Sequence, residues 1–331
     1  MRFRFLSAFL VALVSSMPVT AAPPAPATAP APRAIPGVRV ERDVRYVPDG
    51  DAAQVLDLYV PEKAGEKPLP LLVWVHGGGW RGGTKAGNPG VALIPQGYAA
   101  ASVEYRFSQK AVFPAQIQDC QAAIRWLRAN AKKYNIDPDR IGVWGDSAGG
   151  HLVALLGTAG GTGAFAPIGG NADVSDRVQA VCDFYGPANF NTVMEQAAAD
   201  AVKNIYPFNT PRDPYSGLIG VHMGADKAKT DAVSPVNHVS KDDAPFLILH
   251  GTADVHVPFA QSVELADALK RAGVSVTLQR FPGGGHGGPA FNLPAVRTLI
   301  RTFFDKHLKG ADVTVEALPD AAVTVPPAAG R

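Results

Sequence analysis

One serine lies in a short glycine-rich turn between an apolar run and an apolar helical pattern. Residues 145–149 read Gly-Asp-Ser-Ala-Gly, after the run 141–144 and before the segment 150–156. A strand, a tight turn and a helix in this order are typical of a nucleophile elbow, which exposes a serine hydroxyl at the top of a sheet. Glycines flank the serine because a Cβ there would collide with the adjoining strand and helix. The pattern predicts that Ser147 is a nucleophile, and the alternative is a helix N-cap in a glycine-rich turn.

A second loop favours the nucleophile. Apolar residues 71–75 lead into His76-Gly-Gly-Gly-Trp80. Consecutive glycines let bare backbone N–H groups approach a substrate oxygen, as in an oxyanion hole. A helix N-cap at Ser147 would leave this loop unexplained. We expect His76 to shape the loop, and Trp80 either to line the substrate pocket or to pack the loop against the core.

A candidate acid and a candidate base follow two later apolar runs. Asp254 comes after the run 246–250, and His286 lies in the glycine-rich loop after 274–281. A histidine can take the proton of a serine hydroxyl, and a carboxylate can orient the imidazole. The chain order Ser, Asp, His is the order of α/β-hydrolase triads.

Two alternatives compete for the role of Asp254. Three other aspartates precede the run at 246 and would emerge at the opposite end of that strand: Asp231, Asp242 and Asp243. His250, Asp254 and His256 could instead form a zinc site, because imidazole and carboxylate are zinc ligands. The triad already uses Asp254, so we expect neither a metal nor an organic cofactor.

Hydrophobic periodicity predicts an α/β fold with a mostly parallel eight-stranded sheet and helices on both faces. The first two strands alternate in polarity and should pair antiparallel, whereas the later ones are continuously apolar. The predicted strands are 38–47, 55–60, 71–75, 99–105, 141–145, 178–185, 246–250 and 274–281, and the predicted helices are 114–133, 148–158, 260–272 and 291–308.

An insertion at 187–235 contains no clear strand. So long a segment inside a domain is usually a lid or a binding element. The alternative is two ordinary surface helices with their own small core. Its apolar side chains are candidates for substrate contacts, above all Phe190, Met194, Tyr206 and Phe208.

The termini differ from the central 37–310 domain. Residues 1–22 have the basic, apolar and small-residue parts of a cleavable signal peptide, which predicts a periplasmic or secreted protein. A Pro/Ala-rich linker at 23–36 follows, and the tail 311–331 also looks weakly structured.

Charge and cysteine content restrict the partners. Without the first 22 residues the chain has 29 basic and 29 acidic side chains, so nucleic-acid binding and stable membrane insertion have no support.

An exported protein could pair Cys120 with Cys182, but both positions look like small core residues, and we favour unpaired thiols.

These motifs resemble α/β-hydrolase esterases of the hormone-sensitive-lipase type, especially the bacterial feruloyl/acetyl-xylan-esterase-like branch (BD-FAE-like). The resemblance covers about residues 40–310. It is carried by 76–80, Tyr105-Arg106, Phe113-Pro114, Asp119, 145–151, 250–254 and 285–287.

The resemblance implies a serine carboxylesterase that acts on short-chain acyl esters, with acetyl or feruloyl esters of plant polysaccharide among the candidate substrates. It implies a triad of Ser147, Asp254 and His286. Oxyanion amides would come from Gly78, Gly79 and Ala148. A peptidase or amidase, or a non-catalytic binding protein with a hydrolase fold, are the alternatives.

Overall fold

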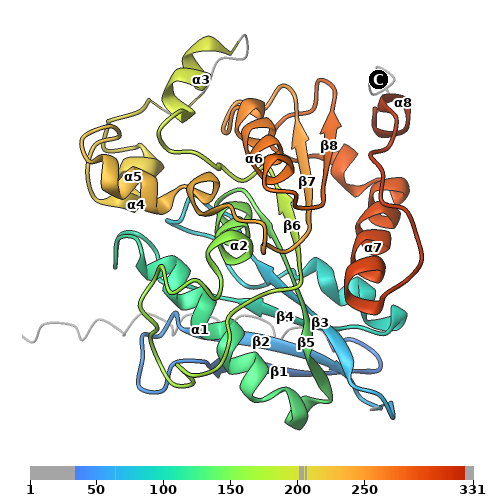
Figure 1. Cartoon of the computed structure of the whole chain (residues 1–331). Coiled ribbons are helices and arrows are strands. Elements are labelled where there is room, and N and C mark those ends of the chain that lie inside the picture. The colour runs from blue at the N-terminus through green and yellow to red at the C-terminus, as the bar shows by residue number, and fades with distance from the viewer. Residues whose placement is uncertain (1–33, 64, 201–204, 206, 325–331) are drawn as a thin grey trace, which may run out of the picture. The chain divides into compact units, whose positions relative to one another are not determined.

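Eight strands form one sheet in the computed structural model, which describes residues 34–63, 65–200, 205 and 207–324 (Figure 1). The strand order is β1-β2-β4-β3-β5-β6-β7-β8. The strands are β1 (Val38–Arg45), β2 (Val55–Pro61), β3 (Leu69–Val75), β4 (Ala99–Val103), β5 (Ile136–Asp146), β6 (Ala180–Phe184), β7 (Phe246–Gly251) and β8 (Val276–Phe281). β2 pairs antiparallel with both β1 and β4, and the pairs from β4 to β8 are parallel. The predicted mostly parallel eight-stranded sheet is confirmed.

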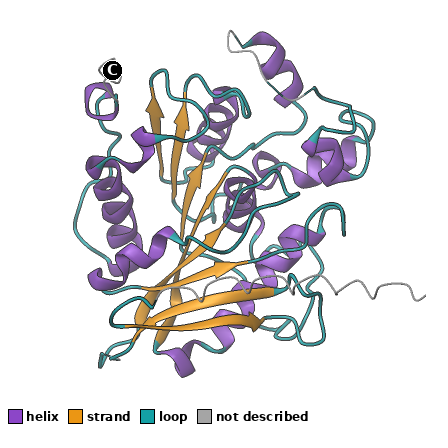
Figure 2. Ribbon diagram, turned by 180° about the vertical axis from the view of Figure 1, so that it is seen from behind, coloured by secondary structure: helices purple, strands orange, loops and turns teal. Residues whose placement is uncertain are grey.

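The sheet twists strongly along its width. β1 and β2 run nearly across the direction of β7 and β8 in both ribbon views (Figure 2). Such twist is the normal consequence of strand chirality. The carboxyl ends of the parallel strands still meet along one edge, which is where open α/β sheets place their sites.

Helices cover both faces of this sheet. Alternate side chains of β3 and its neighbours, such as Leu71 and Val73, pack in one core with α1 (Ala115–Ala129), α2 (Ala148–Ala159) and α6 (Phe259–Arg271). The intervening side chains, such as Leu72, pack in a second core with α7 (Pro294–Lys309). A parallel strand with helices on both faces must be apolar on both sides, which explains the continuous apolar runs.

Several short elements were not expected. A 3₁₀ helix, η1 (Pro89–Gln96), follows the loop after β3, and η2 (Ala131–Tyr134) follows α1. Another 3₁₀ helix, η4 (Pro289–Asn292), precedes α7. The predicted helix at 291–308 therefore begins at Pro294, because a proline is best tolerated in the first turn of a helix.

The described part of the insertion 187–235 contains three short helices instead of two. They are α3 (Val193–Ala199), α4 (Pro214–Ile219) and α5 (Lys227–Val233), and η3 (Pro235–His238) follows them. Prolines and aspartate N-caps divide the segment into these single- and two-turn helices.

The described tail at 311–324 has little regular structure, as expected, but it packs against β8. Gln279 of β8 accepts a hydrogen bond from the backbone of Leu318 at 2.6 Å, and Arg280 pairs with Asp320. A short helix, α8 (Asp320–Val323), buries Val323 in the core beside α7. The tail thus covers the edge strand of the sheet, which otherwise offers unpaired backbone groups.

The predicted signal peptide at 1–22 and most of the predicted linker lie outside the described residues. The chain divides after Ile35, and the unit from Pro36 onward contains all eight strands. Among the described residues, every helix is too short or too polar to cross a membrane. Cys120 and Cys182 are buried free thiols, which confirms the expectation of unpaired cysteines.

Candidate active site

Ser147 lies at the turn from β5 into α2, with φ 53° and ψ −119°. This positive φ is strained for a residue with a side chain. A Cβ on Gly145 would lie 2.4 Å from the carbonyl oxygen of Gly149, and one on Gly149 would lie 2.1 Å from that of Val75. The two flanking glycines therefore permit the turn that the sequence predicted.

A continuous hydrogen-bond chain joins three side chains at the strand ends. Oγ of Ser147 lies 2.8 Å from Nε2 of His286. Nδ1 of the same ring lies 2.6 Å from Oδ2 of Asp254. With the proton on Nδ1, the imidazole donates to the carboxylate and leaves Nε2 able to accept the serine proton. The structure thus brings together the three residues that the sequence placed in a triad.

The Asp254 carboxylate is held by more than His286. Its Oδ1 accepts backbone hydrogen bonds from His256 at 2.7 Å and Val257 at 3.0 Å, and Nε2 of His250 lies 3.2 Å from Oδ2. Burial raises the pKa of Asp254, but hydrogen bonds from His250 and His286 outweigh burial and hold that pKa well below its ordinary value. The carboxylate is therefore ionised across the neutral range, as an orienting group for histidine requires.

The alternative assignments find little support in the geometry. Each rival aspartate binds a neighbour near its own turn: Asp231 pairs with Lys227, Asp242 with Lys241, and Asp243 accepts from Ser240. The His256 ring lies beside His286, with 4.7 Å between ring centroids. Across the described residues, no group of three or more His, Cys, Asp or Glu side chains has a metal-binding arrangement.

The loop after β3 is braced on several sides. Its Gly77 N–H donates to Oδ1 of Asp146 at 2.8 Å. The His76 ring stacks on Tyr105, and its Nε2 lies 2.9 Å from Oε1 of Glu104. The Tyr105 hydroxyl donates to the carbonyl of His76 at 3.0 Å. His76 thus shapes the loop, as expected, and Tyr105 braces it. The neighbouring Arg106 pairs with Asp119.

The amides predicted for the oxyanion hole lie on this loop and on the elbow. Gly78 and Gly79 have φ of 112° and 60°, conformations that favour glycine. Ala148 is the first residue of α2, whose leading N–H groups have no acceptor within the helix. Within the described chain, none of these three N–H groups donates a hydrogen bond to a protein acceptor. An N–H group without a protein acceptor can donate to a ligand oxygen, so their role in an oxyanion hole stays a prediction.

Trp80 packs the loop against the core. Its ring is 2% exposed and contacts Phe190, Tyr215 and His151. Its indole N–H donates to Nδ1 of His151 at 3.2 Å, and Nε2 of His151 lies 2.7 Å from the carbonyl oxygen of Val233. Burial lowers the pKa of His151 to about 4, so the ring is neutral.

Side chains of the insertion pack behind the loop that follows β3. Phe190, 2% exposed, contacts both Trp80 and Tyr215, and Phe208 packs on Tyr215. Phe190 and Met194 also line a cavity of about 400 Å³, whose wall includes no member of the Ser147 triad. Trp80 therefore takes the packing role, one of the two expected for it, and the substrate contacts predicted for Trp80, Phe190 and Met194 stay predictions. Tyr206 lies outside the described residues.

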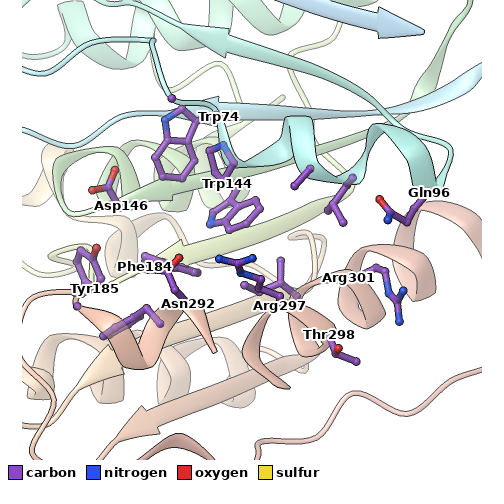
Figure 3. A pocket seen from close by; sticks show the side chains of 18 residues that line it. Trp74, Gln96, Trp144, Asp146, Phe184, Tyr185, Asn292, Arg297, Thr298 and Arg301 are labelled. Atoms are coloured by element: carbon purple, nitrogen blue, oxygen red, sulfur yellow. The ribbon is translucent and has the colours of Figure 1, made fainter. Parts of the chain in front are cut away.

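A larger cavity of about 580 Å³ lies on the α7 face of the sheet (Figure 3). Its wall includes no triad member either, but it includes Asp146 and Gly287, the residues next to Ser147 and His286, and Tyr185, whose ring lies 4.4 Å from that of His286. Two tryptophans from the sheet, Trp74 and Trp144, form another part of the wall. The sequence analysis missed both.

A signal for these tryptophans exists in the sequence. Trp74 stands two residues before His76 and Trp144 stands directly before Gly145, and the two are paired neighbours in the register of β3 and β5. Period-two alternation places both on the same face of the sheet.

Comparison with known proteins agrees with this architecture. A family model, BD-FAE, matches residues 56–269. The esterase LipC of Mycobacterium tuberculosis is 33% identical over 72% of this chain. The chain covers 57% of LipC, and it likewise spans little more than half of two further relatives from that organism, LipM and LipQ.

Solved structures show the same fold. A truncated carbohydrate esterase from gut microbiota is 32% identical, with a TM-score of 0.73 over 82% of this chain and 96% of that one. An acetyl ester-xyloside bifunctional hydrolase from Caldicellulosiruptor lactoaceticus is 28% identical, with a TM-score of 0.60 over 77% and 87%. The family match, the strand order and the elbow together show that the chain has the α/β-hydrolase fold and belongs to the BD-FAE family.

Proposed function

We propose that this domain hydrolyses carboxylic esters through an acyl-enzyme on Ser147. The hydrogen-bond chain from Ser147 through His286 to Asp254 carries the proposal. His286 takes the serine proton as Oγ attacks the ester carbonyl, and then protonates the departing alcohol. A water molecule deprotonated by the same histidine releases the acid and restores the hydroxyl.

The amides of Gly78, Gly79 and Ala148 stabilise the oxyanion that forms during both steps. Fixed donors of this kind act on charge that develops only in the transition state. The partial positive charge at the N-terminus of α2 adds to their effect.

Short acyl esters are the proposed substrates, with acetyl and feruloyl esters of plant polysaccharide as the leading natural candidates. The relatives that the chain matches, which are named esterases and a carboxylic ester hydrolase, support a carboxylic ester as the substrate. The solved neighbours described as a carbohydrate esterase and an acetyl ester-xyloside hydrolase support the polysaccharide assignment.

Kinetics of triad variants test the mechanism. We expect Ser147→Ala and His286→Ala to lower kcat/KM for p-nitrophenyl acetate about 10⁴-fold or more, with Asp254→Asn somewhat milder. Ser275→Ala, at an exposed serine ahead of β8, is the matched control. A fluorophosphonate should label the wild type at Ser147, and a Ser147→Ala enzyme with a tenth of wild-type turnover would contradict the nucleophile assignment.

A panel of esters tests the substrate class. We expect p-nitrophenyl acetate and butyrate to exceed octanoate and palmitate in kcat/KM. Acetylated xylan and methyl ferulate extend the panel to the natural candidates. An optimum at palmitate with activation at an oil interface would indicate a lipase.

Export is also a proposal, supported by the signal-peptide pattern of residues 1–22. Cleavage after Ala21 or Ala22 is expected. Intact-mass measurement of the protein from the native host checks this, and a cytoplasmic chain that begins at Met1 would contradict it.

A further inference from the structure

The cavity on the α7 face carries features that ester hydrolysis at Ser147 does not use. We propose that it binds the alcohol part of the substrate, and that this part is a sugar ring bearing a carboxylate. The inference rests on the proposed ester hydrolysis, because it assigns the cavity to the leaving group of that reaction.

The position of the cavity is the first argument. Asp146, Tyr185 and Gly287 place one end of it beside Ser147 and His286. Its volume of about 580 Å³ lies within the range of small-molecule sites, about 300–1,000 Å³. An alcohol joined to the ester carbon at Ser147 can therefore extend into it.

An unpaired donor in the wall is the second argument. Trp144 is 8% exposed, and its Nε1 has no hydrogen-bond partner among the described residues. A buried N–H without an acceptor is destabilising, and nearly all such groups in proteins have a hydrogen-bond partner. A sugar hydroxyl or ring oxygen in the cavity can accept from Nε1 once the indole turns slightly toward the cavity, because the atom has almost no accessible surface in the present conformation.

The shape and polarity of the wall favour a ring with polar edges. Trp74 and Trp144 meet edge to face, with 5.8 Å between ring centroids, and offer apolar ring surface. Asn292 and Gln96 add amide groups to the same wall. Figure 3 shows the two tryptophans on the sheet side of the cavity, and Asn292 and Arg297 on the other.

The charges along the cavity indicate that the ligand carries an acidic group, and they determine how the ligand is oriented. Arg297 and Arg301 stand one turn apart on α7 and both line the cavity. Neither guanidinium forms an ion pair or hydrogen bond with another described residue. Asp146 stands at the end near the triad. A ligand carboxylate is therefore attracted to the arginines and repelled from the triad end, which leaves the esterified hydroxyl next to Ser147.

Competitive inhibition by unesterified sugars tests this proposal without requiring their turnover. The inhibitors are methyl glucuronoside and methyl glucoside, which differ only by a carboxylate in place of a hydroxymethyl group. With p-nitrophenyl acetate as substrate of the full chain, we expect the glucuronoside to inhibit competitively and about tenfold more strongly than the glucoside. The same ligands should change the tryptophan fluorescence, because two of the four tryptophans line the cavity.

Two sets of variants test whether the inhibition by sugars depends on the cavity. Arg297→Gln with Arg301→Gln should abolish the preference for the glucuronoside. Trp144→Phe should weaken both sugars about fivefold, because it removes the N–H and keeps an aromatic ring. The controls are Arg271→Gln and Trp126→Phe, on helices that cover the opposite face of the sheet.

The outcomes separate this proposal from the proposed function. Ester hydrolysis without inhibition by either sugar, or inhibition unchanged in the arginine and Trp144 variants, would overturn the sugar site and leave the esterase intact. Sugar binding measured by fluorescence in a protein without esterase activity would overturn the leaving-group assignment. Competitive inhibition that depends on these three side chains supports both.

Discussion

The backbone N–H of Gly77 donates to Oδ1 of Asp146 at 2.8 Å. This bond ties the loop after β3 to the residue that directly precedes Ser147. It fixes the candidate oxyanion amides relative to the candidate nucleophile, although the two segments are about seventy residues apart in the chain. Asp146 is a positioning residue in this account, because it acts through the loop.

Asp146→Ala should therefore lower kcat for p-nitrophenyl acetate about 10- to 100-fold with little change in KM. The expected loss is smaller than that for complete removal of an oxyanion donor, about 10²–10³-fold. Asp146→Asn keeps an acceptor for Gly77 and should recover most of the activity. Equal losses in the two variants would show that the charge matters instead of the hydrogen bond.

Trp80→Phe should destabilise the protein by about 1–3 kcal/mol, because it leaves Nδ1 of the buried His151 without its donor. Urea unfolding followed by circular dichroism measures this loss. Trp126→Phe on α1 is the control, since that indole donates no hydrogen bond to a described residue. Equal stability of the two variants would mean that the bond from Trp80 to His151 contributes nothing.

Asp183 should make the stability depend on pH. Burial raises the pKa of this β6 side chain to about 7, and its Oδ2 has no hydrogen-bond partner in the described chain. Between about pH 4 and pH 7 the folded state holds a proton that the unfolded state has lost. Stability therefore falls as the pH rises through this window.

Asp183→Asn removes the titration and can keep the acceptor for the N–H of Gly186, now 2.9 Å from Oδ1. We expect Tm of Asp183→Asn to rise relative to the wild type as the pH goes from 5 to 8. Differential scanning calorimetry at several pH values measures the difference. A difference in Tm that is constant with pH would contradict the assigned titration.

Gly149→Ala should prevent folding or cost more than about 4 kcal/mol, because its Cβ would lie 2.1 Å from the carbonyl oxygen of Val75. Backbone atoms of a central strand cannot move aside. Gly170→Ala, with open space around its Cβ position, is the matched control and should fold normally. Soluble yield and circular dichroism compare the two, and a stable Gly149→Ala protein would contradict the close contact.

The amino-acid sequence by itself determined the sheet and the triad candidates. The alternation between continuous apolar runs and helical patterns reflects burial of parallel strands on both faces, so it can be read without a structure. Ser147, Asp254 and His286 each follow such a run, and strand ends of a parallel sheet meet along one edge. Such patterns can be read from the sequence because the burial of each residue depends on its position within a single strand or helix.

Only the tertiary structure decided the surroundings of these residues. The sequence left two roles for Trp80, lining the substrate pocket or packing in the core. The structure decides for the core, because Phe190 and Tyr215 of the insertion pack against its ring. The tail at 311–324 looked weakly structured because its contacts with β8 are made to residues some forty positions away. The cavity between Trp144 and Arg297 likewise joins a strand and a helix that are distant in the chain. Such contacts depend on packing between elements, and no local pattern of residues records which elements will meet.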